Sequence, residues 1–356
     1  MVVNIIENFT ITAYESVTDM LQEPSPCAPE LNHKSPIYFV INASAGSRDA
    51  QLQQQVIEDA LSVAGRTGEL IFSQPEDLAR NARTYALKAA QMHSAIVAVG
   101  GDGTINTVAQ AAHTQGCAMG VIAQGTFNYF ARTHGLPADV AQAMDILLHS
   151  PVVPVQVATI NQHVFLVNAS LGLYPKLLED REAYKARFGR SRLVAFGAAC
   201  ITLLQAHRQL RLHIELANAA RDVRTSTLFV GNNQLQLEQV GVHVHSTVGE
   251  HTGYANRHGR VAAVVLRPMG TLAMLRLMLH GAMGTLGQAD TVDSFEFNRM
   301  VVKPRLDYGR RKVKVAFDGE VQWMQSPIEF AVSPRPLYLL KPSVQNMSSA
   351  TEPAQT

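Results

Sequence analysis

The sequence predicts an α/β protein of two domains, a doubly wound α/β domain followed by a β-rich domain. Short apolar runs alternate with segments of helical periodicity between residues 36 and 151, which is the pattern of parallel strands joined by helices. From residue 152 onward, strand-like segments follow one another and several alternate in polarity, as antiparallel strands with one wet face do. A length of 356 residues is sufficient for two such domains.

The first domain is expected over residues 36–151. Apolar runs at residues 37–41, 68–72, 95–99 and 118–123 are the expected strands, and residues 51–64, 78–92, 105–112 and 127–132 are the expected helices. The run at 95–99 is hydrophobic throughout, as central parallel strands tend to be.

The second domain is expected over residues 152–325. Its predicted strands lie at residues 152–160, 163–170, 210–216, 226–231, 260–267, 294–302 and 312–317, and helical stretches at 176–205 and 270–284 interrupt them. Residues 326–342 include an apolar run at 337–340 that could return to the first domain. Residues 1–35 read as a flexible, proline-rich extension and residues 343–356 as a disordered tail.

Composition limits the partners. A hydrophobic content of 47% indicates a globular chain, and a net charge of +1 provides no global field for nucleic acid, so no nucleic-acid partner is expected. Three dispersed cysteines fit a reducing compartment. The longest strongly apolar run, residues 193–204, is too short to span a bilayer. We therefore expect a cytoplasmic protein that reaches any lipid from the water side, peripherally at the inner membrane surface.

A glycine-rich turn, Gly100-Gly101-Asp102-Gly103-Thr104, follows the 95–99 strand directly and precedes a helix. Glycines let the backbone approach a ligand with no Cβ in the way, and the free amides of a helix start attract an anion. Thr104 is the expected N-cap of that helix. Because phosphate repels a carboxylate, Asp102 indicates Mg²⁺ binding or a general base. The alternative is a tight turn with a surface aspartate.

A second glycine turn, Gln124-Gly125-Thr126-Phe127-Asn128, follows the 118–123 run. Two parallel strands that end in such turns place both at the carboxyl edge of one sheet, where ligands bind. Alone, the second turn would be interpreted as structural. Together with the first, it predicts a ligand site.

Six segments occur in a fixed order along residues 36–342: residues 42–46, 100–104, 125–132, 171–172, 231–233 and 318–320. In this order they resemble the diacylglycerol kinase catalytic family, which includes bacterial lipid kinases and sphingosine kinases. The resemblance implies a nucleotide-binding α/β domain and a β-sandwich-like lipid-binding domain. It implies ATP and Mg²⁺ as cofactors, and transfer of the γ-phosphate to a hydroxyl of a diacylglycerol-like or sphingoid lipid at a membrane surface. A homodimer is left open.

The resemblance also assigns roles. Asp102 and Glu320 would be the catalytic carboxylates, dividing proton transfer and metal positioning. Taken alone, Asp318-Gly319-Glu320 reads as a strand-ending turn with solvated charges. The residues expected near the nucleotide and its phosphates are Asn42, Gly46, Gly100, Gly101, Gly103, Thr104, Gly125, Thr126, Arg187 and Arg192. ATP phosphates would supply most Mg²⁺ ligands, so no protein metal-ligand set is predicted.

The chain departs from the family pattern at two places. Tyr129 stands where the family usually has Asp, and residues 256–260 (Asn-Arg-His-Gly-Arg) replace an acidic segment that is associated with a structural metal in some members. A basic segment cannot hold a hard cation, so we predict that this metal is absent. Two other functions stay open, a NAD kinase-type enzyme and a nucleotide- or lipid-binding protein without catalysis. Residues 270–284 are a candidate membrane-contacting helix, although a core helix is favoured.

Overall fold

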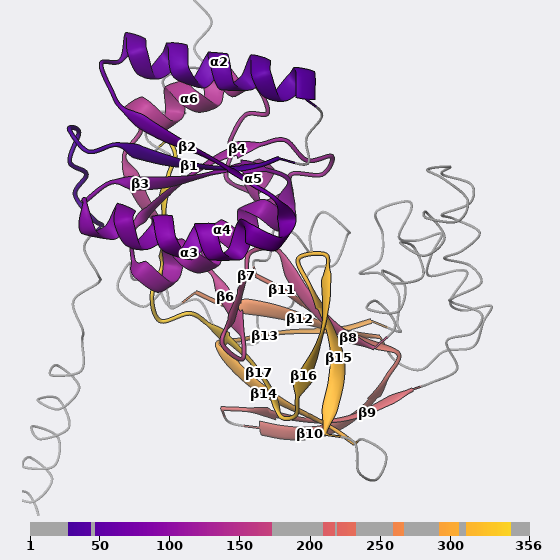
Figure 1. Cartoon of the computed structure of the whole chain (residues 1–356). Coiled ribbons are helices and arrows are strands. Elements are labelled where there is room, and N and C mark those ends of the chain that lie inside the picture. Colours follow the sequence, from indigo (N-terminus) through magenta and orange to yellow (C-terminus); the bar gives the residue numbers. More distant parts are fainter. Residues whose placement is uncertain are drawn as a thin grey trace, which may run out of the picture.

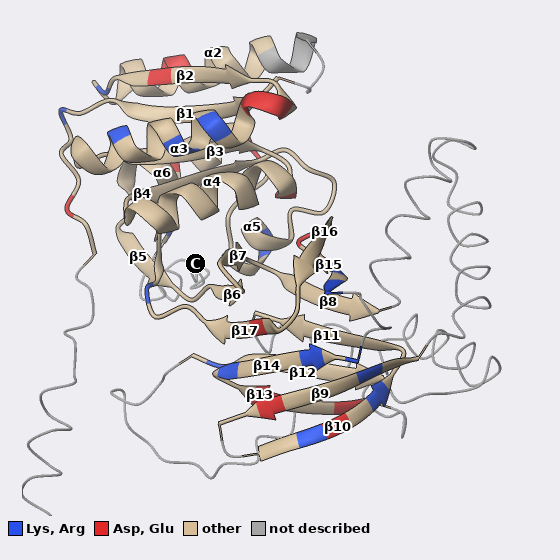
Figure 2. Ribbon diagram, turned by 60° about the horizontal axis from the view of Figure 1, so that its bottom comes forward, with Lys and Arg blue, Asp and Glu red and all other residues tan. Residues whose placement is uncertain are grey.

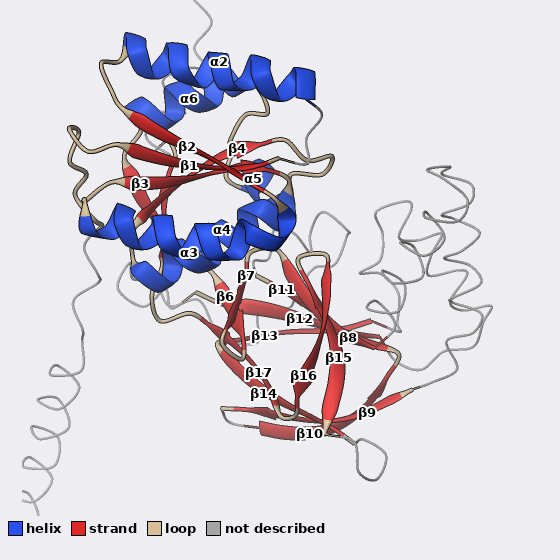
Figure 3. Ribbon diagram, viewed as in Figure 1, coloured by secondary structure: helices blue, strands red, loops and turns tan. Residues whose placement is uncertain are grey.

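The computed structural model describes residues 28–43, 47–172, 209–217, 219–232, 259–266, 292–305 and 311–342. Within these ranges the chain forms an N-terminal α/β domain with a parallel sheet and a C-terminal domain of antiparallel sheets, as the sequence predicted (Figure 1). Figure 3 shows the described helices gathered in the first domain, while the described part of the second domain consists of strands.

The first domain is built on a six-stranded sheet of order β2-β1-β3-β4-β18-β5. Its strands are β1 (Ile37–Asn42), β2 (Gly68–Ser73), β3 (Ala95–Gly100), β4 (Ala118–Ala123), β5 (Val152–Val155) and β18 (Leu337–Leu340). Strands β1 to β4 are parallel. Helices α2 (Ser47–Val63) and α6 (Val140–His149) cover one face, and α3 (Pro75–Gln91), α4 (Asp102–Gln115) and α5 (Tyr129–Thr133) cover the other (Figure 1).

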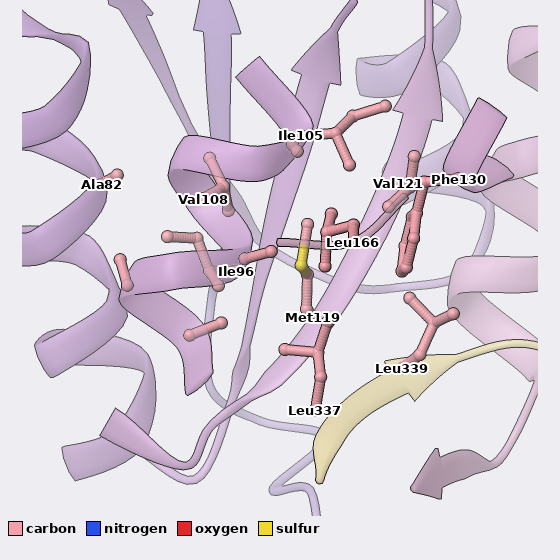
Figure 4. Packing of buried hydrophobic residues seen from close by; sticks show 14 of the residues in the cluster. Ala82, Ile96, Ile105, Val108, Met119, Val121, Phe130, Leu166, Leu337 and Leu339 are labelled. Carbon is pink, nitrogen blue, oxygen red and sulfur yellow. The ribbon is translucent and has the colours of Figure 1, made fainter. Parts of the chain in front are cut away.

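Alternating side chains of the central strand β3 supply both cores. Ile96 and Ala98 join the cluster formed with α3, α4 and α5, whereas Val97 and Val99 pack with α2 and α6. Every residue of β3 is buried, which explains its unbroken apolar sequence. Figure 4 shows the first cluster, in which Leu166 lies among side chains of the first domain. The core on this face therefore continues into the start of the second domain.

The described part of the second domain forms two six-stranded antiparallel sheets. Their orders are β10-β9-β14-β17-β6-β7 and β13-β12-β11-β8-β15-β16. The strands are β6 (Ala158–Ile160), β7 (His163–Phe165), β8 (Asn168–Gly172), β9 (Leu210–Leu216), β10 (Ala219–Thr225), β11 (Thr227–Gly231), β12 (Val261–Leu266), β13 (Val292–Phe297), β14 (Arg299–Pro304), β15 (Lys312–Phe317), β16 (Glu320–Gln325) and β17 (Ile328–Val332). Both sheets contribute alternate residues to one shared core, which is the arrangement of a sandwich.

The domain boundary differs from the prediction. Strand β5, expected in the second domain, is instead the edge of the first sheet, where it pairs with β18 in antiparallel register. Strand β18 also pairs with β4 in parallel, whereas β17 stays in the sandwich. The boundary at residue 151 is therefore too early, because β5 is short and its partner lies far along the chain.

Other differences are local. Helix α6 and strands β10, β16 and β17 were not expected. The predicted helical stretches at 176–205 and 270–284 lie outside the described residues, as do residues 1–27 and the tail from residue 343. Among the helices that the structure describes, none combines the length and hydrophobicity needed to span a bilayer.

Candidate functional site

The first glycine turn joins β3 to α4. Helix α4 begins at Asp102 and its N-cap is Gly101, with no side-chain cap. Thr104 is therefore not the N-cap that the sequence suggested, since the helix begins two residues earlier. Instead Thr104 is buried and its Oγ1 accepts a hydrogen bond from Asn42 Nδ2 at 3.3 Å. This contact ties the end of β1 to the turn.

The second glycine turn packs directly on the first. Gln124 N donates to the carbonyl of Gly100 at 2.8 Å. A Cβ added to Gly125 would lie 3.0 Å from Gly101 Cα and 2.7 Å from Asn128 Oδ1, which is closer than a side chain allows. Because β3 and β4 are neighbouring parallel strands, both turns lie at the carboxyl edge of the sheet.

Asp102 connects the two turns. Its Oδ2 accepts the backbone N–H of Asn128 at 3.1 Å, at the left-handed residue that precedes α5. Burial raises the pKa of Asp102, and the N–H groups of Asn128, Tyr129 and Phe130 oppose that rise. Its Oδ1 is buried and has no hydrogen-bond partner among the described residues. Asp102 thus holds the second turn with one oxygen and keeps the other for a further ligand.

Glu320 reaches the first turn from the other domain. It follows the hairpin turn between β15 and β16, in which Asp318 and Gly319 have φ values of +46° and +90°, the conformation of a tight two-residue hairpin. A Cβ added to Gly103 would lie 3.8 Å from Glu320 Oε1. Figure 2 shows the acidic tip of this hairpin beside α5. The two carboxylates predicted from the sequence, Asp102 and Glu320, therefore lie at the same turn.

Asp318 anchors the tip of the β15–β16 hairpin through hydrogen bonds to the segment before β8 and to α4. Its carboxylate accepts the N–H groups of Leu166, Val167 and Asn168 at 2.7, 2.9 and 3.1 Å. It also accepts Asn106 Nδ2, from α4, at 2.6 Å. Burial outweighs these donors and raises the pKa of Asp318 to about 6. Since Asp318 precedes Glu320 by two residues, this network positions Glu320.

A polar stripe on α4 makes further contacts between the domains. Asn106, Gln110 and His113 lie on one side of the helix, about one turn apart. Gln110 Oε1 accepts Val164 N at 2.6 Å, and His113 Nε2 lies 2.8 Å from Ser333 Oγ. Burial lowers the pKa of His113. The same helix therefore carries the glycine turn at its start and the docking side chains along its length.

This stripe was not predicted from the sequence. The available signal was polar residues at spacings of four and three in a helix whose apolar residues are one isoleucine, one valine and three alanines. Polar residues at such spacings ordinarily face water, so nothing in the local pattern placed them between domains.

Comparison with known proteins supports the resemblance to the diacylglycerol kinase catalytic family. Residues 36–160 match the model of the diacylglycerol kinase catalytic domain. The chain is 29% identical over 165 residues to a "Probable lipid kinase YegS-like" protein of Klebsiella pneumoniae, covering 43% of this chain and 52% of that protein. It is 26% identical over 137 residues to a "Diacylglycerol kinase" of Staphylococcus saprophyticus, covering 38% and 44%. Residues 36–160 are therefore similar to the diacylglycerol kinase catalytic domain, in agreement with the resemblance found in the sequence.

The fold comparison extends further along the chain. A diacylglycerol kinase structure from Bacillus anthracis is similar with a TM-score of 0.60 at 15% identity, covering 86% of this chain and 96% of that one. At this identity the likeness concerns the fold alone. The sequence matches span only about half the length of the curated relatives, whereas the family model matches the part of the chain that carries the two glycine turns.

Two other segments that carried the family resemblance have a supporting role. Asn232, buried at the end of β11, donates from Nδ2 to the carbonyl of Leu166 at 3.1 Å and from its backbone to Val167 at 3.0 Å. Asp318 binds the N–H groups of the same segment. Asn232 and Asp318 therefore hold one loop from both sides, and this loop brings Glu320 to the glycine turn.

The other predicted site residues differ in how far the structure places them. Thr126 is exposed on the second turn. Tyr129, which replaces the usual family Asp, is 45% exposed and stacks on Phe127, with ring centroids 5.4 Å apart. Gly46, Arg187, Arg192 and the 256–258 part of the basic segment lie outside the described residues.

The donor set at the turn fits a magnesium nucleotide. The N–H groups at the start of α4 suit phosphate oxygens, and the spare Oδ1 of Asp102 suits a hard cation. In the part of the chain that the structure describes, no three His, Cys, Asp or Glu side chains converge. Asp102 and Glu320 alone would leave most ligand positions of a bound Mg²⁺ to phosphate and water.

Proposed function

We propose that the chain is an ATP-dependent lipid kinase that transfers the γ-phosphate to a hydroxyl of a diacylglycerol-like or sphingoid lipid. The observation that carries the proposal is the placement of Glu320, from the second domain, against Gly103 of the phosphate-binding turn. A carboxylate at that point can accept the proton of an attacking hydroxyl. The family and the fold support this reaction class.

Each group of the site has a distinct task in this proposal. Backbone N–H groups at Gly103 and Thr104, at the start of α4, orient the phosphates. Asp102 Oδ1 holds the position of the cation, while its Oδ2 keeps the second turn in place. Glu320 takes the hydroxyl proton. Bound Mg²⁺ would neutralise charge on the transferring phosphoryl group.

The test is radiolabel transfer from γ-labelled ATP to extracted lipids in the presence of Mg²⁺, with a parallel reaction on NAD. Glu320→Gln keeps size and hydrogen bonding but removes the base, so labelled lipid should fall by about two to four orders of magnitude. Transfer by Glu320→Gln at the parent rate would remove the proposed role of this carboxylate. Labelled NAD without labelled lipid would favour the NAD kinase alternative.

A second candidate is a nucleotide- and lipid-binding protein without turnover. It is favoured by the use of Asp102 Oδ2 as an acceptor for the Asn128 N–H group and by Tyr129 at a position that is usually acidic in the family. In that case ATP would bind, and no lipid or NAD would be labelled.

We further propose that the protein works in the cytoplasm, peripherally at the inner membrane surface.

A further inference from the structure

We propose that the outer face of the β15–β16 hairpin, formed by Lys312, Lys314, Val321, Trp323 and Gln325, docks on the surface of an anionic lipid bilayer. The proposal rests on the proposed lipid kinase function, because it concerns how the same site meets its substrate. Its test, however, needs neither ATP nor turnover. Phosphoryl transfer and membrane docking can therefore fail separately.

The hairpin presents two different faces. Val313, Val315 and Phe317 of β15 point into the sandwich core, so the alternate residues Lys312 and Lys314 point outward. Strand β16 is the edge of its sheet, and Trp323 pairs in register with Lys314. The outward face therefore combines lysines with an aromatic ring.

Trp323 is exposed to an unusual degree. It is the only tryptophan of the chain, and 62% of its surface is accessible. Indoles are normally buried, or lie at interfaces where one side is apolar and the other wet. Lys314 Nζ lies 5.1 Å from the centre of its ring. A tryptophan beside lysine is the composition that anchors proteins in the headgroup region of a bilayer.

The position of this face suits the chemistry. Trp323 follows Glu320 by three residues on one strand, which corresponds to about 10 Å. Because residues three apart point to opposite faces of a strand, the Glu320 side chain points away from the docking face and toward Gly103. Docking through Trp323 would hold the strand that carries Glu320 near the headgroup layer, where a lipid hydroxyl lies. On the first-domain side of the site, Phe127 and Tyr129 are also exposed aromatic rings. Three of the four exposed aromatic side chains in the described residues thus lie on the hairpin, on the second turn or at the start of α5, and Phe72 is the fourth.

A second copy of the chain is a weaker candidate for this face. A stable interface buries about 800 Å² on each partner around an apolar centre, whereas one tryptophan supplies about 250 Å² at most. The exposed neighbours of Trp323 on β16 are Glu320, Gln322 and Gln325, which are polar. A single aromatic ring flanked by lysines suits shallow insertion between anionic headgroups better.

The experiment uses the full chain and Trp323 as its own probe. Vesicles of phosphatidylcholine containing a quarter phosphatidylglycerol are added without ATP. The emission of Trp323 should shift to the blue and be quenched by lipids brominated on the upper acyl chain. Trp323→Gln should lower vesicle partitioning in sedimentation by about tenfold, and Lys312→Gln with Lys314→Gln by about fivefold per lysine. Pure phosphatidylcholine should lose the lysine effect.

The matched control is Phe72→Gln. Phe72 is an exposed aromatic residue on β2, the edge strand of the first sheet, and its loss should leave partitioning unchanged. Trp323→Phe should restore part of the binding if the ring matters, and unfolding midpoints check that each variant folds. In the kinase assay, Trp323→Gln should lose transfer to lipid in vesicles and keep transfer to a short-chain lipid dispersed in water.

Three results would overturn the proposal. The protein could fail to sediment with these vesicles. It could sediment while Trp323 emission stays unchanged, which would assign docking to another surface. Its emission could instead shift with protein concentration alone, accompanied by a doubled mass in sedimentation equilibrium, which would assign the face to a second copy of the chain. If vesicle binding behaves as expected and no lipid is ever phosphorylated, the docking surface stands and the kinase proposal falls.

Discussion

Replacement of Asn106 by leucine should weaken the contact between the domains. Asn106 Nδ2 donates to Asp318 Oδ2 at 2.6 Å and to the carbonyl of Val164 at 3.3 Å. Leucine has nearly the same shape and no donor. Loss of a hydrogen bond to a charged group costs about 1.5–3 kcal/mol, and the weakened carbonyl contact adds about 0.5–1 kcal/mol. Asn106→Leu should therefore lower the free energy of unfolding by roughly 2–4 kcal/mol at neutral pH.

The cost should depend on pH, because the donor acts on a titrating group. The pKa of Asp318 is about 6 in the folded protein against an ordinary value of 3.8. The folded chain therefore holds this proton more tightly, and the contribution of Asp318 to stability falls as pH rises from about 4 to about 6. Loss of the Asn106 donor raises the pKa further. Asn106→Leu should cost at least 1 kcal/mol more at about pH 7.5 than at about pH 5, where Asp318 is protonated.

The assay is urea unfolding followed by far-UV circular dichroism at both pH values. Gln110→Leu is the matched control, because Gln110 lies one turn along the same face of α4 and accepts the uncharged Val164 N–H. Its cost should be about 1 kcal/mol and the same at both pH values. Equal costs of Asn106→Leu at the two pH values would refute the assignment of Asp318 as the charged partner. A cost below about 0.5 kcal/mol would show that the contact does not hold the domains.

Three further outcomes are expected. Asp102→Asn should fold like the parent and lose phosphoryl transfer by orders of magnitude in the radiolabel assay, since the proposed role of Asp102 at the cation needs the charge; transfer at the parent rate would contradict that role. Gly125→Ala should lower the unfolding free energy by about 1–3 kcal/mol because its Cβ would collide with Gly101 and Asn128. In contrast, the Cβ of Gly103→Ala would meet only Glu320 Oε1, at 3.8 Å, so this variant should fold normally and bind nucleotide less well. Equal unfolding curves for both variants would refute this distinction. The pKa of His134 is lowered to about 4 by burial and by Lys341, so the contribution of neutral His134 to stability is lost as pH falls from about 6.5 to about 4. His134→Phe should therefore reduce the loss of stability in acid, measured by urea unfolding at a series of pH values, by up to about 3 kcal/mol.

The local parts of the site were predictable from sequence. A strand followed by Gly100-Gly101-Asp102 and a helix is a short-range pattern, and its geometry follows from glycine and the helix start. The first residue of helix α4 was predicted less accurately. Thr104 was a plausible N-cap in the sequence, but in the structure its hydroxyl accepts a hydrogen bond from Asn42. The helix begins after Gly101 without any side-chain cap, and local sequence does not determine such a boundary to within a residue or two.

The long-range parts were less accessible. Glu320 was predicted as a site residue only through the family resemblance, since Asp318-Gly319-Glu320 alone indicates a solvated turn. The buried carboxylate of Asp318 accepts a hydrogen bond from Asn106, more than two hundred residues earlier in the chain. Hydrophobic periodicity is a local pattern and does not predict so distant a contact. Likewise β5 and β18 are short apolar strands that pair with each other, so neither could be assigned to the first sheet from its own sequence.

The place of β18 has a consequence for how the chain is made. Strand β4 has β3 on one side and β18 on the other, and β5 joins the first sheet only through β18. A ribosome releases the first domain's early strands long before residue 340, and domains tend to fold as they emerge. Until then the β4 edge is uncovered, and open edges recruit other strands. Completion of the first domain's sheet must therefore wait for synthesis of the sandwich strands that precede β18 in the chain.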